Sequence, residues 1–234
     1  MTARGRSAAS SRAGDSGGSV ARLGPPGLSI RLLGPVEVLV DGRPLAVDTR
    51  KAVALLAYLA ITAQPASRDR LAALLWPESS DPDGRSALRR TLSVLNAAVG
   101  PQRLTIDRQR VELVDSDVTI DLRVFRERLH DARRHGHSPD QACASCIAVL
   151  EQAQLLDRGE FMAGFSLRDS DSWDEWQRSE AEAVDRERSA ALERLTRALA
   201  AARRWDGAVR FARRTPTSPR WRAGQPSQAR AVSS

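Results

Sequence analysis

Several features that define whole classes of protein are scarce in this chain of 234 residues. It contains two cysteines, Cys143 and Cys146, and no run approaching the roughly 20 apolar residues that cross a bilayer. Arg4, Arg6 and Arg12 lie near the start, but no apolar core of a signal peptide follows them. We therefore expect a cytoplasmic protein without disulfides, without a membrane span and without a secretory signal.

Motifs of catalysis and cofactor binding are also missing. There is no glycine-rich phosphate loop after a strand, no G-x-S-x-G elbow and no H-E-x-x-H. The only histidines are His130, His135 and His137. We therefore expect neither an enzyme nor a protein with a cofactor or a small-molecule substrate.

Positive charge is abundant by contrast. The 36 basic residues outnumber 29 acidic ones and give a net charge of +7, which favours a polyanionic partner. A bland alternative is that arginine is simply common in this composition, since Lys51 is the only lysine. The positions of the arginines must decide between the two interpretations.

The chain begins with a polar tail and then changes to a period of two. Residues 1–27 are rich in Ser, Gly, Ala and Arg and predict a disordered, mildly basic tail. Apolar residues alternate from Leu28 to Val40, and Asp41-Gly42 supplies the positive φ angles of a tight hairpin turn. A small antiparallel sheet is expected here.

Three helices and a second hairpin follow the sheet. The helices are expected at 49–62, after the N-cap candidate Ser67 as far as Trp76-Pro77, and from Asp81-Pro82 to Val99. Alternation at 104–113 predicts the hairpin. The unit 28–116 is therefore expected to be an α+β domain with the element order of a winged helix-turn-helix: strands, three helices and a hairpin.

The remainder is expected to be all-α from 117 to 214, with interruptions at His135–Pro139 and Gly159–Asp171. Residues 215–234 are Pro, Ser, Arg and Gln without apolar periodicity, which predicts a second disordered tail.

The third helix divides into an apolar and a cationic face. Its apolar stripe begins at Leu88, and its opposite side is polar, as a recognition helix in the major groove requires. A solvated arginine face is the alternative, and the neighbouring basic hairpin argues against it. The candidate DNA-binding residues are Arg85, Ser86, Arg89, Arg90 and Ser93 on the helix, Arg108 and Arg110 on the wing, and Arg50, Lys51 and Arg68 as phosphate contacts.

Two further groups of residues have competing interpretations. His135, His137, Cys143 and Cys146 offer four zinc-type ligands, but zinc sites usually draw ligand pairs from separated segments, so packing cysteines and loop histidines are favoured and no metal is expected. Trp173 and Trp176 share a helix face and could anchor a partner, although packing within the chain is the preferred interpretation.

The sequence resembles the SARP-type transcriptional regulators, whose winged helix is similar to the effector domain of response regulators. The second half resembles their bacterial transcriptional activator domain. The residues that carry the resemblance are Leu75–Glu78, Ala87–Leu92, Leu104–Leu113, Asp121-Leu122 with Phe125, Arg158–Phe165 and Trp173–Trp176.

This resemblance implies a tetratricopeptide-like helical domain for self-association, possible homodimers, and promoter activation by contact with RNA polymerase. The family continues with further helix pairs where residues 215–234 stand here, so the helical domain is expected to be incomplete. The expected function is a sequence-specific DNA-binding transcriptional regulator, with double-stranded DNA as the partner. The alternative is a protein-interaction adaptor or non-functional remnant without specific DNA binding.

Overall fold

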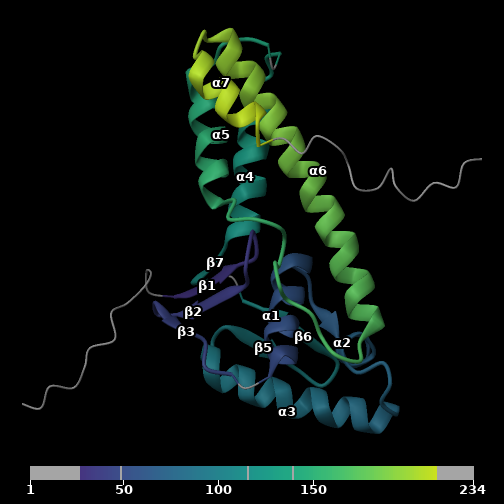
Figure 1. Ribbon diagram of the computed structural model, residues 1–234. Coiled ribbons are helices and arrows are strands. Elements are labelled where there is room, and N and C mark those ends of the chain that lie inside the picture. Colours follow the sequence, from purple (N-terminus) through teal and green to yellow (C-terminus); the bar gives the residue numbers. More distant parts are fainter. Residues whose placement is uncertain (1–26, 48, 115, 139, 215–234) are drawn as a thin grey trace, which may run out of the picture.

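The computed structural model describes residues 27–47, 49–114, 116–138 and 140–214. The tails expected at 1–27 and 215–234 lie outside the described residues, apart from Gly27. The described chain has a lower part of small sheets and three helices and an upper part of packed helices (Figure 1). This arrangement confirms the expected two-part architecture in outline.

The first sheet is built around the expected hairpin. Strands β1 (Leu28–Arg31), β2 (Glu37–Val40) and β3 (Arg43–Pro44) pair antiparallel. The turn at Asp41 and Gly42 has φ angles of 50° and 76°, as the predicted tight turn requires.

A fourth strand corrects the prediction that the chain is helical after residue 117. Strand β7 (Val118–Ile120) pairs parallel to β1, with Leu28 opposite Val118, and completes the order β3-β2-β1-β7. Three residues are too few for a period of two to stand out, and the partner strand lies far away in the sequence. The N-terminal sheet is therefore closed by a segment assigned to the helical half.

The three expected helices form close to their predicted bounds. Helix α1 spans Arg50–Thr62, α2 spans Arg68–Leu75 and α3 spans Asp81–Val99. The side chain of Ser67 accepts a hydrogen bond from the Arg70 backbone N–H, which confirms Ser67 as the N-cap of α2.

The second hairpin also forms, with one addition. Strands β5 (Leu104–Ile106) and β6 (Arg110–Leu113) pair antiparallel, and β4 (Ala66–Ser67) adds to β6 in the order β4-β6-β5. The two-residue strand β4 joins the hairpin directly to the start of α2.

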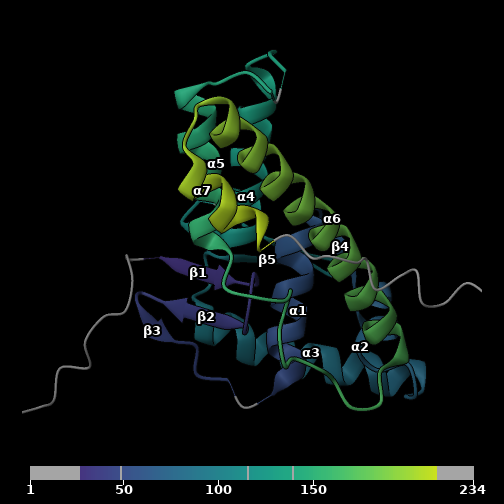
Figure 2. The same ribbon diagram turned by 45° about the horizontal axis from the view of Figure 1, so that its top comes forward.

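The upper part consists of α4 (Asp121–Arg134), α5 (Ala144–Leu156), α6 (Asp171–Ala201) and α7 (Trp205–Ala212). Helices α4, α5, α7 and the end of α6 pack together (Figures 1 and 2). The start of α6 lies beside α2 in the lower part. Helix α6 thus contacts both parts of the molecule.

Aromatic packing joins these parts into one core. Trp173 is fully buried, its ring centroid lies 4.6 Å from that of Trp176, and Trp176 lies 5.2 Å from Tyr58 of α1. Packing within the chain is therefore confirmed as the role of the tryptophan pair. The Asp121 carboxylate adds a polar link, since it accepts hydrogen bonds from the backbone N–H groups of Leu32 and Leu33.

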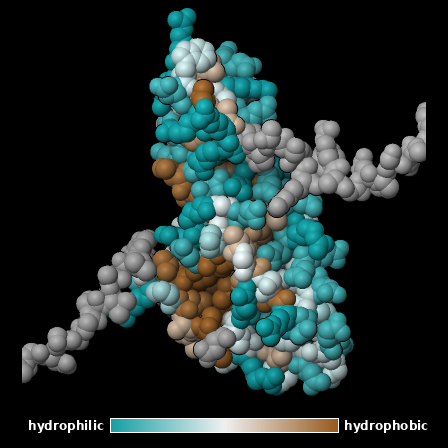
Figure 3. Space-filling model, viewed as in Figure 1, coloured by the Kyte–Doolittle hydropathy of each residue, from teal (hydrophilic) through white to brown (hydrophobic). Residues whose placement is uncertain are grey.

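One face of the molecule carries a hydrophobic patch. Figure 3 shows hydrophobic residues gathered on one face over the region of the first sheet and α1, while the surrounding surface is mostly hydrophilic. Among the described helices, none combines the length and the hydropathy needed to cross a bilayer.

Candidate nucleic-acid interface

Helix α3 is positioned by a continuous apolar stripe. Leu88, Leu92, Leu95 and Val99 are all nearly inaccessible to solvent and pack toward α1 and α2. Both views place α3 at the end of the molecule opposite the upper helices (Figures 1 and 2). Helix α3 therefore lies apart from the upper helices, and its main contacts are with α1 and α2.

The outer face of α3 carries the predicted polar residues. Arg85, Arg89, Arg90 and Ser93 are exposed, and Ser86 is half-buried. Because these residues follow each other at intervals of four along two adjacent rows, they present one continuous surface. Arg90 donates a hydrogen bond to the hydroxyl of Ser86 at 3.2 Å.

The interactions of Arg85 leave it available to a ligand. Its Nε lies 2.8 Å from a carboxylate oxygen of Asp69, and the two side chains are 59% and 72% exposed. Exposed ion pairs of this kind contribute little stability, typically below about 1 kcal/mol. A phosphate or base edge can therefore compete for this guanidinium.

An open groove of about 770 Å³ brings most of the candidates together. It lies between the start of α2, the outer face of α3 and the tip of the β5–β6 hairpin. Five arginines line it against a single carboxylate, so its potential is strongly positive. The lining residues are Ser67, Arg68, Asp69, Pro82, Arg85, Ser86, Arg89, Arg108, Gln109 and Arg110.

A second groove of about 480 Å³ continues along α3. Arg68 and Arg89 line both grooves, and Ser93 lines the second. Arg89 thus lies at the centre of the combined basic surface. Arg90 lines neither groove.

The tip of the hairpin is held by its own carboxylate. The Asp107 side chain accepts hydrogen bonds from the backbone N–H groups of Arg110 and Gln109, which hold the pKa of Asp107 below its usual value. Arg68 donates to the Asp107 carbonyl at 3.0 Å, and its backbone N–H donates to the Gln109 carbonyl at 2.8 Å. These bonds fix the hairpin tip, which carries Arg108 and Arg110, relative to the start of α2.

Two of the expected phosphate contacts lie elsewhere. Arg50 donates to the carbonyls of Ser166 and Gly164, and its guanidinium lies 4.7 Å from the Phe165 ring centroid. Lys51 lies over the Trp76 ring at 5.0 Å, and burial lowers its pKa. Arg50 therefore joins α1 to the segment that precedes α6, and Lys51 joins α1 to the end of α2. Neither side chain lines the basic grooves.

A buried arginine that supports the interface was not recognised in the sequence. Arg103 precedes β5, its side chain is 5% exposed, and it pairs with Asp117. Its hydrogen bonds to Asp117 raise its pKa further above the ordinary arginine value. An arginine in a polar turn gives no local signal of burial, so only the fold reveals it.

Comparisons with known proteins support the architecture. No protein-family model and no curated protein sequence matches the chain. Among solved structures, the chain is similar to EmbR of Mycobacterium tuberculosis, which was solved in complex with a low-affinity phosphopeptide, with a TM-score of 0.52 and 23% sequence identity. The likeness shows a shared fold. It covers 81% of this chain, which spans 59% of the EmbR chain.

Proposed function

We propose that this chain is a sequence-specific DNA-binding transcription regulator, most simply an activator, in which α3 is the recognition helix and the β5–β6 hairpin is the wing. The observation that carries the proposal is the groove with five arginines and one carboxylate at the exposed end of the molecule. A positively charged, open groove beside a protruding helix suits duplex DNA better than a compact small-molecule ligand.

The residues divide into those that read bases and those that contact phosphates. Arg85 and Arg89 project from the exposed face of α3, where a guanidinium can donate two hydrogen bonds to a guanine edge. Ser86 and Ser93 are small enough for the helix to approach the groove floor. This division assigns sequence preference to α3.

The wing and the start of α2 are proposed to contact the backbone. Arg108 and Arg110 are exposed on the hairpin, and Arg68 lines both grooves beside them. Phosphate contacts of this kind fix register and supply salt-dependent affinity without reading sequence. Arg50 and Lys51 are left out of the proposed interface because of their contacts within the chain.

The helical half is proposed to receive partners, including RNA polymerase or a second copy of the chain. Leu155 of α5 is 82% exposed, and Trp205 and Val209 of α7 are 60% and 52% exposed. Exposed apolar side chains on neighbouring helices are typical of surfaces that associate with other chains. The helical half would thereby couple DNA binding to recruitment.

Selection from genomic DNA tests the proposal. The purified chain is incubated with fragmented DNA at about physiological salt, retained fragments are sequenced, and the best one is placed in competition with bulk DNA. A recurrent motif bound at least about 1,000-fold more tightly than bulk DNA is the expected result. Uniform, salt-sensitive retention would contradict it and favour the adaptor without specific DNA binding.

A further inference from the structure

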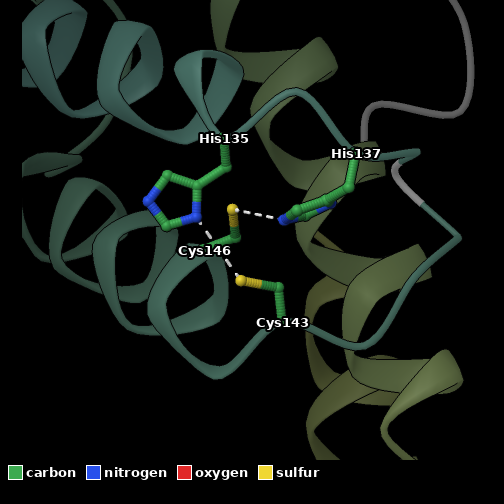
Figure 4. Close-up of side chains that lie close together, drawn as sticks. All are labelled: His135, His137, Cys143 and Cys146. Carbon is green, nitrogen blue, oxygen red and sulfur yellow. Dashed lines mark hydrogen bonds between the residues drawn. The ribbon is translucent and has the colours of Figure 1, made fainter.

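The turn between α4 and α5 gathers four side chains that DNA binding does not use. His135 lies directly after the end of α4, and His137 lies two residues further along the turn. Cys143 is the N-cap residue of α5, and Cys146 lies in its first turn. Figure 4 shows the four side chains pointing toward one another from the two helix ends.

The distances between these side chains match a metal site. The Sγ of Cys143 lies 3.5 Å from Nδ1 of His135, and the Sγ of Cys146 lies 3.3 Å from Nε2 of His137. All four ligand atoms lie within 4.8 Å of one another. Zn–S and Zn–N bonds in tetrahedral geometry place ligand atoms about 3.3 to 3.8 Å apart. Only a small contraction is therefore needed to bind one ion.

The sequence favoured packing cysteines and loop histidines because zinc sites usually draw their ligand pairs from separated segments. In the folded chain the two pairs belong to different elements, since the histidines follow α4 and the cysteines begin α5. Packing accounts for the buried Cys146 alone, since Cys143 and His137 are half-buried and His135 is exposed. Four convergent donors at a partly exposed turn need another explanation.

The surroundings favour the thiolate form of Cys143, while opposing effects act on Cys146. Hydrogen bonds from the Cys146 backbone N–H and from His135 lower the pKa of Cys143 to about 6, while burial raises the pKa of Cys146. Both cysteines lie at the N-terminal end of α5, where the helix dipole favours negative charge. Arg194 of α6 donates to the Ala132 carbonyl at 2.9 Å. Its positive charge lies near Cys146 and partly offsets the effect of burial on the pKa of that thiol.

We propose that His135, His137, Cys143 and Cys146 form a tetrahedral zinc site that locks the turn between α4 and α5. Two nitrogens and two thiolate sulfurs are a donor set that zinc prefers, and two thiolates neutralise the ion. Because four protein ligands leave no open position, the site is structural. It would stabilise the contact between α4 and α5 at the end of the molecule far from α3.

Metal content and cobalt substitution test the site directly. The full chain is purified without affinity-tag metal in the presence of a thiol reductant, and zinc per chain is measured by mass spectrometry. The metal-free chain is then titrated with Co²⁺ alone, which reports tetrahedral thiolate ligation through intense visible bands and a near-ultraviolet charge-transfer band. Variants C143S and H137A are compared with H130A, which removes the exposed histidine outside the cluster.

The expected result is about one zinc per chain and a tetrahedral cobalt spectrum in the wild type and in H130A. Saturating zinc at about a hundredfold excess over Kd should raise Tm by about 5–10 °C in these two proteins. C143S should lose the charge-transfer intensity of one thiolate and most of the Tm shift. Should a variant not fold, the cobalt spectrum of the wild-type chain decides.

Three outcomes would overturn the proposal. The first is a reduced wild-type chain that has negligible zinc and gives only the weak spectrum of octahedral cobalt. The second is a full tetrahedral spectrum in C143S. The third is a Cys143–Cys146 disulfide that forms and persists in the presence of excess zinc, which would indicate a redox pair.

Discussion

The guanidinium of Arg103 pairs with the carboxylate of Asp117, with Nη2 2.7 Å from Oδ2. Arg103 is almost fully buried, and it also donates to the Val99 carbonyl at the end of α3 and to the Asp41 carboxylate at 3.4 Å. One side chain therefore ties the proposed recognition helix and the base of the wing to the first sheet.

This pair predicts an acid-dependent loss of stability. The hydrogen bonds of Arg103 lower the pKa of Asp117 in the folded chain, so the stabilisation is complete above the ordinary aspartate pKa of about 3.9 and is lost as pH falls through the lower folded value. D117N should lower Tm at pH 7. The difference in Tm between wild type and D117N should then shrink below about pH 4. Thermal melts of both proteins from pH 7 to pH 3 measure this difference. A difference at pH 3 as large as that at pH 7 would contradict the role of the pair.

Arg89→Ala tests the recognition face. Arg89 is exposed and lines both grooves, so its loss should leave Tm unchanged and weaken binding to the selected DNA site by about 5- to 150-fold, the equivalent of one base-reading contact. Gel retardation on the selected site and on bulk DNA measures both affinities. The matched control is R186A, which removes an exposed arginine from α6. Equal affinity of R89A and R186A for the selected site would contradict the placement of Arg89 in the DNA-binding face.

The wing arginines should act on affinity without altering sequence preference. R108A and R110A are each expected to weaken binding to all duplexes and to reduce the slope of log K against log salt by about 0.9. Titrations at several salt concentrations on specific and non-specific DNA provide the slopes. A loss confined to the selected site would show instead that the wing reads bases.

Arg50→Ala separates fold from function. Because Arg50 is hydrogen-bonded to Ser166 and Gly164, we expect a Tm lower by a few degrees and DNA affinity unchanged within about twofold. Retardation assays at a temperature well below the Tm of the variant make the comparison fair. A loss of DNA affinity without a loss of Tm would contradict this prediction and indicate that Arg50 contacts DNA.

The tryptophans of the helical half should differ sharply in their effect on stability. W173A removes a fully buried ring between the two parts and is expected to cost about 3–5 kcal/mol of unfolding free energy. W205A removes a ring that is 60% exposed and should change it by no more than about 0.5 kcal/mol. Urea unfolding of both variants checks this, and similar losses would contradict the burial pattern.

Local sequence patterns predicted the parts of the fold that depend on interactions between residues close in the sequence. The Asp41-Gly42 turn, the Ser67 cap and the stripe that begins at Leu88 each follow from neighbouring residues, and each appears as expected. The polar face of α3 follows from the same stripe, since the two faces of a helix are related by its period. These are the elements on which the proposed DNA contact depends.

Contacts between distant segments could not be predicted in this way. The pairing of β7 with β1, the contact of buried Arg103 with Asp41 and the hydrogen bonds of Arg50 all involve partners far along the chain. The sequence showed Arg50 and Lys51 only as charges at a helix start, which suit phosphate contact or simple surface charge. Their contacts with Ser166, Gly164 and Trp76 favour a role within the chain.

The sequence by itself determined a basic chain whose order of elements matches a winged helix-turn-helix and whose third helix has one cationic face, because composition and periodicity are properties of neighbouring residues. Only the tertiary structure decided which arginines share a groove and that His135, His137, Cys143 and Cys146 converge at one point. Such convergence depends on how the ends of α4 and α5 meet, and that geometry is fixed by packing across the whole helical half.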